Sequence, residues 1–279
     1  MKALSGRLTV SLALLLCFCW AGCGDGDAPV GGYAIAVTNS YLQCAVWDLW
    51  GEDVSVLCLA PPGMCPGHFD ISPAQVRQLK GCTLLVRFDF QQGIEDRLAR
   101  LRERGLDMQQ VRPPAGLCVP DTYVAVCRQV CRVLSRAFPE RAGRCETRLA
   151  AIESRLATLG AQLRDSITES GIAAAAVLTS NHQAEFARWL GLDPIATFVG
   201  SDTETVANVD HCLKKAVGRD VRFVIANRQE GTALAHALAD RCEAKAVVFS
   251  NFPERCEQGV GFDRLLVDNV RVLCEAGVK

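Results

Sequence analysis

Apolar positions along the chain alternate between two kinds of spacing. Short runs rich in Val, Ile, Leu and Phe are followed by longer stretches in which apolar residues recur every three or four positions. Short apolar runs are typical of strands buried on both faces of a sheet, and the longer spacing is typical of amphipathic helices. The alternation therefore predicts repeated βα units and parallel sheets.

The pattern occurs twice along the chain. Strands are predicted in the first half over 33–37, 54–59, 83–88 and 108–111, and in the second half over 172–178, 195–199, 221–226 and 246–249. Helices are predicted over 41–50, 73–80, 94–104, 121–137, 182–190, 203–217, 232–242 and 262–275. The fold class is therefore α/β, with two (β/α)4 lobes that each contain a parallel sheet.

One long helix is predicted between the two halves. Residues 139–167 carry Leu149, Ile152, Leu156 and Leu163 at helical spacing, with Arg and Glu on the other face. Such a helix would be roughly 40 Å long, enough to act as a stiff connector. We expect a first lobe at 32–138, a linking helix at 139–168 and a second lobe at 169–279. A coiled coil with another chain is the alternative for this helix, although its heptads are not sustained.

The amino-terminal segment has the pattern of a secretory signal. Lys2 and Arg7 precede an apolar run over 8–20, which ends in small residues before Cys23 and a polar linker. The run is shorter than a membrane span needs. It resembles a bacterial lipoprotein signal, which implies cleavage of residues 1–22, lipidation of Cys23 and a linker over 23–31. A plain secretory peptide or a membrane anchor is the alternative. The remainder of the chain would be extracytoplasmic, on the periplasmic side or the cell surface.

Charge and cysteine content narrow the function. Lys plus Arg number 30 and Asp plus Glu 31, so the formal charge is -1 and a nucleic-acid partner is not expected. Fifteen cysteines fit an oxidising compartment. We interpret Cys127 and Cys131, four apart on one helix face, as core thiols, and pairings among the scattered cysteines stay open. No Cys-x-x-Cys, Gly-x-Ser-x-Gly, Walker or His-Glu-x-x-His motif is present, so an enzyme is not expected.

Candidate ligands follow the predicted strands, where parallel βα folds place their sites. They are Cys65 and His68 after the second strand, Cys118 after the fourth, His182 after the fifth and Asn251 after the eighth. Cys and His together suit zinc or a softer ion. Alternatives are a Cys65–Cys118 disulfide and a Cys118 nucleophile with His182 as its base.

The end of the third predicted strand carries two further charged residues. Arg87 and Asp89 are expected to pair with each other at the same edge of the sheet. There they would hold a ligand in position without contacting the metal ion themselves.

Several segments together resemble the substrate-binding lipoproteins of zinc and manganese ABC importers. They are Leu-Ala-Pro-Pro-Gly at 59–63, His-Phe-Asp-Ile-Ser-Pro at 68–73, and the stretches over 179–187, 244–249 and 262–273. The resemblance covers nearly the whole chain after the signal. It implies a monomer that captures a divalent metal ion between two lobes and delivers it to a membrane ABC permease, without catalysis.

The resemblance also implies which residues would bind the metal. His182 falls on the family's third ligand position, and His68 lies one residue after the first. Cys65 takes the place of an aspartate, Cys118 lies near an absent histidine, and Asn251 aligns with an aspartate ligand. Loss of the anionic aspartate favours zinc and disfavours manganese. The alternatives are a softer ligand such as copper(I), a metal complex, or a metal-free module for surface binding or adhesion.

Overall fold

The first sheet is formed by the amino-terminal half of the chain. The computed structural model describes residues 34–52, 54–60, 70–200, 203–254 and 261–278. The parallel strands β1 (Ile35–Val37), β2 (Val56–Cys58), β3 (Leu84–Phe88) and β4 (Asp107–Val111) lie in the order β2-β1-β3-β4. The helices of this half are α1 (Ser40–Trp50), α2 (Pro73–Leu79), α3 (Gly93–Arg97), α4 (Ala99–Arg102) and α5 (Pro120–Ala137).

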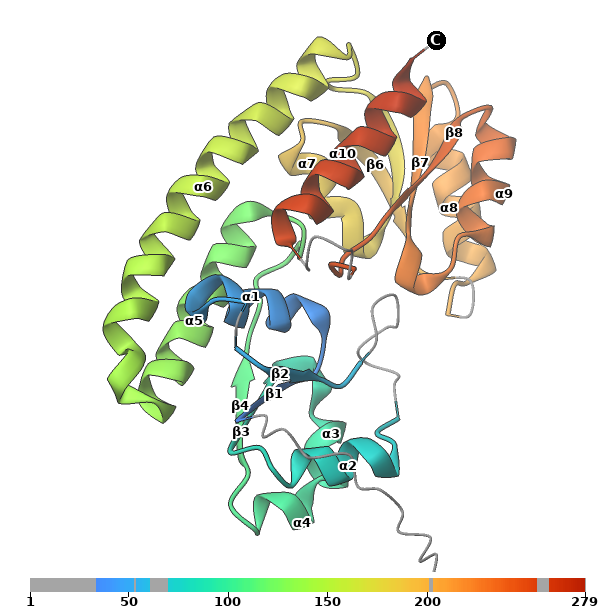
Figure 1. Cartoon of the computed structure of the whole chain (residues 1–279). Helices are drawn as coiled ribbons and strands as arrows, with labels where there is room; N and C mark the ends of the chain where they lie inside the picture. Colours follow the sequence, from blue (N-terminus) through green and yellow to red (C-terminus); the bar gives the residue numbers. More distant parts are fainter. Residues whose placement is uncertain (1–33, 53, 61–69, 201–202, 255–260, 279) are drawn as a thin grey trace, which may run out of the picture. The chain divides into compact units, whose positions relative to one another are not determined.

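The second sheet repeats this topology in the carboxyl-terminal half (Figure 1). The parallel strands β5 (Ala176–Ser180), β6 (Asp193–Phe198), β7 (Val221–Asn227) and β8 (Lys245–Phe249) lie in the order β6-β5-β7-β8. The helices are α7 (Ala184–Trp189), α8 (Val206–Ala216), α9 (Ala233–Cys242) and α10 (Phe262–Gly277). The predicted fold class, two four-stranded parallel βα lobes with one long helix between them, is confirmed.

The long helix α6 spans Ala142–Glu169 and follows a 3-10 turn at Pro139–Arg141. It packs against α1 and α5 of the first half and against α10 of the second (Figure 1). Its buried positions include Ile152, Leu156 and Leu163, which lie on the apolar face expected from their spacing. This helix therefore contributes one face to a core that both halves share.

The largest differences from the predicted elements are in one helix and one strand. The helix expected over 94–104 is broken into α3 and α4 at Leu98, whose φ of -105° and ψ of 11° depart from helical values. The strand expected over 172–178 begins later, at Ala176, because Gly171 and Ala174 have positive φ angles and form a turn. This shift moves the carboxyl end of β5 to Ser180, next to His182.

Aromatic side chains connect the two halves. Tyr41 of α1 lies 5.5 Å from the ring of Phe262 of α10 and 6.5 Å from that of Phe252. Tyr123 of α5 stacks on Phe262, with 3.9 Å between ring centroids and an interplanar angle of 4°. All four rings are buried, so the inner core runs without interruption from one sheet to the other.

The described ranges hold ten of the fifteen cysteines. All ten cysteines in the described ranges carry free thiols, and Cys127 and Cys131 are buried in the core as predicted. None of the helices within those ranges combines the length and the apolar character that crossing a bilayer requires. Cys23, the predicted lipidation site, lies outside the described residues.

Candidate metal centre

His182 lies immediately after the carboxyl end of β5. Ser180 ends the strand, and its Oγ accepts a hydrogen bond from the backbone N–H of His182 at 3.3 Å, which starts the turn Asn181–Gln183. The imidazole is 62% exposed, and its Nε2 lies 3.3 Å from Oε1 of Glu230. The sheet edge therefore presents a histidine and a carboxylate side by side.

Glu230 follows β7 and is fixed by two neighbouring polar groups. Its Oε2 accepts hydrogen bonds from Ser180 Oγ at 2.5 Å and from Asn227 Nδ2 at 3.2 Å. Its side chain is only 17% exposed. Hydrogen bonds thus fix one carboxylate oxygen of Glu230 while the other faces His182. Carboxylates that bind metals are often held in this way. Glu230 was not among the residues predicted from the sequence, although its position just after a parallel strand was a usable signal.

Cys118 and Asn251 are brought together from the two halves of the chain. The fully buried thiol of Cys118 donates to Ser250 O at 3.1 Å and to Asn251 Oδ1 at 3.4 Å. Asn269 Nδ2 donates to the sulfur at 3.5 Å. Burial raises the pKa of Cys118 well above its ordinary value, against the opposing effect of the Asn269 hydrogen bond. Cys118 is therefore a neutral thiol at physiological pH in this conformation.

Gln183 connects these two groups of residues. It is fully buried, and its Nε2 donates to Asn227 Oδ1 at 3.3 Å and to Asn251 Oδ1 at 3.0 Å. Its Oε1 is buried and has no hydrogen-bond partner among the described residues. Because Asn227 also donates to Glu230, the amides form a continuous chain of hydrogen bonds from the His182–Glu230 pair to Cys118.

The predicted pairing of the Arg87 and Asp89 side chains is wrong, because each binds another residue. Arg87 is buried and binds Glu95, with 2.8 Å between Arg87 Nε and Glu95 Oε1, while it reaches Asp89 only at the backbone oxygen. The Asp89 carboxylate instead binds Arg112, with 2.9 Å between Oδ2 and Nε. The reason is that Glu95 supplies a partner on α3 for a guanidinium that would otherwise be buried with its charge unpaired.

The remaining predicted ligands, Cys65 and His68, lie outside the described residues. Within the described ranges, no three side chains of His, Cys, Asp or Glu gather closely enough to hold a metal ion. The described part of the candidate centre is therefore the His182–Glu230 pair. Hydrogen bonds of the amide side chains connect this pair to Cys118 and Asn251.

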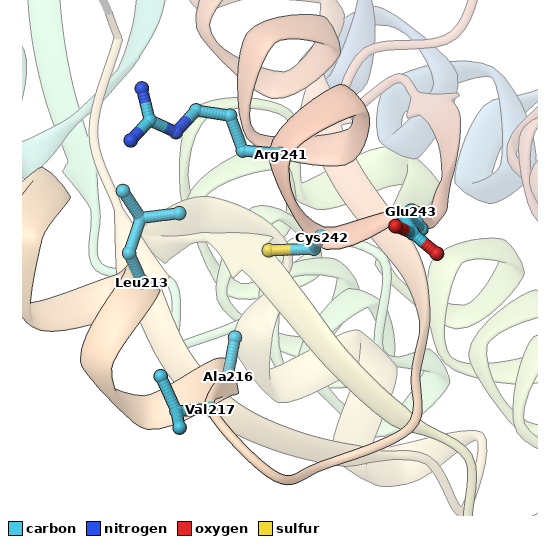
Figure 2. Close-up of a pocket in the computed structure, with 6 residues that line it drawn as sticks. All are labelled: Leu213, Ala216, Val217, Arg241, Cys242 and Glu243. Atoms are coloured by element: carbon cyan, nitrogen blue, oxygen red, sulfur yellow. The ribbon is translucent and has the colours of Figure 1, made fainter.

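A separate hollow lies at the opposite end of the second sheet. It is lined by Leu213, Ala216 and Val217 at the end of α8 and by Arg241, Cys242 and Glu243 at the end of α9 (Figure 2). The carboxyl ends of these helices lead into the amino ends of β7 and β8. Ligand sites of parallel βα folds lie at the other edge, so this hollow is not part of the candidate centre.

Solved structures share the fold at low sequence identity. A crystal structure of ZnuA matches with a TM-score of 0.69 and 17% identity, covering 88% of this chain and 98% of that one. A periplasmic metal-binding protein from Candidatus Liberibacter asiaticus matches in its cadmium-bound and manganese-bound forms. Each of these two has a TM-score of 0.73 and 10% identity, and covers 88% of this chain and 99% of that one. The manganese-bound form gives no support to the expectation that manganese is disfavoured.

The sequence itself also matches a known family. No curated protein matches the chain. The profile of one family, described as the periplasmic component A of the zinc-uptake complex (ZnuA), matches residues 118–276. This stretch includes α5, the long helix and the whole second sheet, and it confirms the resemblance noted in the sequence. The chain therefore belongs to the ZnuA family of periplasmic zinc-uptake components.

Proposed function

We propose that this protein is the extracytoplasmic solute-binding component of a metal ABC importer. It would capture one divalent ion, with zinc preferred, at the carboxyl ends of its strands and deliver it to a membrane permease. Membership of a periplasmic zinc-uptake family supports the general role. The observation that carries the proposal is the pairing of His182 Nε2 with Glu230 Oε1 at 3.3 Å, at the sheet edge where this fold class binds ligands.

His182 and Glu230 are proposed as the first two ligands. Zinc binds imidazole nitrogen and carboxylate oxygen at about 2.0–2.2 Å, so one ion can contact both atoms after a small adjustment of either side chain. The hydrogen bonds from Ser180 and Asn227 would hold the carboxylate in place for the ion. His182 would bind the ion through Nε2 of its neutral imidazole.

The other predicted ligands would bind the ion in addition to His182 and Glu230. Cys65 and His68, in the segment after β2, are proposed to complete the coordination. Cys118 and Asn251 would join only if the metal displaced the hydrogen bond from the thiol to Ser250 O and released the thiol proton. Arg87 and Asp89 have other partners, Glu95 and Arg112, and would influence the ion only through those partners.

The preference among metals depends on which ligands bind. A nitrogen and a carboxylate oxygen suit zinc and also manganese, whereas a thiolate from Cys65 would favour zinc or a softer ion. We therefore expect zinc to bind more tightly than manganese, with the difference reduced when Cys65 is replaced by serine.

Metal content of the purified protein tests the proposal. The chain from residue 24 onward should retain about one zinc ion per chain after loading and gel filtration, measured by plasma mass spectrometry. His182→Ala and Glu230→Gln should lose it, while His236→Ala, which changes an exposed histidine of α9, should retain it. Failure of the wild-type protein to retain zinc, manganese or copper(I), even after reduction, would overturn the proposal.

A metal-free binding module is the second candidate function. The amide side chains of Gln183, Asn227 and Asn251 at the site are neutral, and the described residues supply only two good ligands. If this candidate holds, His182→Ala will change neither metal content nor binding to the cell surface.

The contacts between the two halves support a nearly rigid capture mechanism. Arg155 of α6 binds Asp48 of α1 and Asp263 of α10 at the same time, and the Tyr123–Phe262 stack lies beside them. We expect zinc to change the radius of gyration by less than about 1 Å, as in other preorganised binding proteins. Small-angle X-ray scattering with and without zinc measures this, and a large contraction would contradict it.

The proposed location rests on the amino-terminal signal. We propose that Cys23 carries a lipid and anchors a monomeric protein at the outer side of the membrane. Cys23→Ser should release the protein from the membrane fraction of a producing bacterium, whereas wild-type protein should stay with it.

A further inference from the structure

Two buried thiols in the core of the first half lie next to each other on neighbouring helices. Cys131 lies in α5 and Cys145 in the first turns of α6, and these two helices pack along each other (Figure 1). The Cys145 Sγ is 4.0 Å from the backbone oxygen of Cys131, so the two residues are in contact where the helices meet. Cys131 is 5% exposed and Cys145 is fully buried.

The position of this pair in the chain favours a covalent link. The two residues are separated by 14 positions across a turn, so forming their contact closes only a short loop. Cys127 is on the same helix as Cys131 and four residues away, which does not suit a disulfide between them. A metal site is not indicated here, since no trio of His, Cys, Asp or Glu in the described ranges is arranged to hold an ion.

We propose that Cys131 and Cys145 form a disulfide that fixes the start of the long helix α6 to α5. The oxidant is a disulfide, for which glutathione disulfide is the test reagent. The Cys131 thiolate attacks one of its sulfurs and releases one glutathione thiolate. The Cys145 thiolate then attacks the Cys131 sulfur of the mixed disulfide and releases the second. Both cysteines are oxidised, glutathione disulfide is reduced to two thiols, and the two protons of the cysteines pass to those thiols.

The link must form while the chain folds. Burial raises the pKa of Cys145, so in the folded protein few thiolates are available for exchange. The helix pair is local in sequence, so the two thiols can meet before the rest of the core closes. Oxidation is therefore expected during refolding in a glutathione redox buffer, and slowly or not at all after the reduced protein has folded.

Peptide mapping of the full chain from residue 24 tests the link directly. Protein refolded in glutathione buffer is denatured, treated with iodoacetamide without reductant and digested with trypsin. Cleavage after Lys and Arg places Cys131 in Gln129–Arg132, Cys145 in Cys145–Arg148 and Cys127 in a third peptide, 105–128. The expected result is that most of the Cys145 signal appears as Gln129–Arg132 linked to Cys145–Arg148. Recovery of both peptides as alkylated monomers, or a link from Cys145 to 105–128, would overturn the proposal.

A stability comparison gives a second readout. Adding reductant should lower the urea midpoint of refolded wild-type protein, and it should lower that of Cys145→Ala less. Cys212→Ala, which removes a buried thiol of α8 in the other half, is the matched control and should respond to reductant as the wild type does. An equal response of Cys145→Ala and Cys212→Ala would contradict a stabilising link at Cys145.

Discussion

The two sheets have the same strand order but different chemistry at their carboxyl edges. In the first sheet, Thr38 after β1 donates to Oε1 of Gln91 after β3 at 2.6 Å and Asn39 donates to Thr38, so these positions hold neutral groups that bind one another. In the second sheet, the corresponding edge holds the His182–Glu230 pair. The same strand order therefore carries different side chains at equivalent positions of the two halves, because the loops and not the sheet determine the chemistry.

The two halves are alike in the arrangement of their cores. Each sheet has its own outer cluster of apolar side chains, but the inner faces share one core around Tyr41, Tyr123 and Phe262. A shared core predicts that the halves unfold together despite their separate sheets.

The largest expected effect comes from breaking that shared core. Phe262→Ala removes a buried ring that stacks on Tyr123 and contacts Tyr41, and it should lower the free energy of unfolding by about 3–5 kcal/mol. Urea unfolding followed by fluorescence and circular dichroism measures this loss. Phe90→Ala, which changes a 55% exposed ring near the edge of the first sheet, should cost no more than about 0.5 kcal/mol. Two separate transitions in the wild-type protein would show that the halves are independent.

The difference between the two edges is tested by removing one charge from each. Glu230→Gln should weaken zinc binding by about 10- to 100-fold, because it replaces an anionic oxygen beside His182 with a neutral one. Asp89→Asn, which removes a carboxylate that binds Arg112 after the first sheet, should leave zinc affinity unchanged. Calorimetric titration with zinc measures both. An equal loss in both variants would restore Asp89 as a residue that orients the metal.

Local pattern in the sequence was sufficient for most of the fold. The alternation of short apolar runs with helical spacing located most strands of both sheets, because strands buried on both faces must be almost wholly apolar. The signal was weaker for β4, whose sequence Asp-Met-Gln-Gln-Val is mostly polar and of which only Val111 is buried. The beginning of β5 was misplaced because the turn there depends on positive φ angles at Gly171 and Ala174, and Ala174 gives no signal for such an angle.

The site was less predictable because its geometry depends on contacts between distant residues. The sequence indicated His182 through its place after a strand, but Glu230 becomes its neighbour only because β7 lies beside β5 in the sheet. Similarly, Arg87 and Asp89 are close in sequence, yet each binds a charge from another segment, Glu95 or Arg112. Strand order and charge pairing of this kind leave no local pattern in the chain.

A smaller effect on stability is expected from the ion pairs of Arg155 in α6, which join the two halves. Burial raises the pKa of Asp263, and the charge of Asp48 adds to this, whereas Arg155 opposes it. The folded state therefore binds this proton more tightly than the unfolded state. The resulting stabilisation is complete below the unfolded value of about 3.9 and is lost as pH rises through the folded value. Asp263→Asn should remove this loss, so its stability relative to wild type should increase as pH rises from 4 toward 7, measured by urea unfolding at each pH. A relative stability that falls over this range would contradict the assignment.

The smallest expected effect concerns the first turns of the helices that follow the equivalent edge strands β2 and β6. Helix α2 begins with a neutral capping box between Ser72 and Gln75, whereas at the start of α8 the Glu204 carboxylate accepts from the backbone N–H groups of Val199 and Thr205, both at 2.7 Å. Burial alone would raise the pKa of Glu204, but these hydrogen bonds and that from Asn208 lower it. Its stabilisation is therefore present above the unfolded value of about 4.3 and is lost as pH falls through the folded value. Glu204→Gln should lower the free energy of unfolding at pH 7 by about 0.5–1 kcal/mol and by less in acid, whereas Gln75→Ala should cost a similar amount at every pH. Parallel pH dependences in the two variants would mean that the carboxylate contributes nothing beyond a neutral cap.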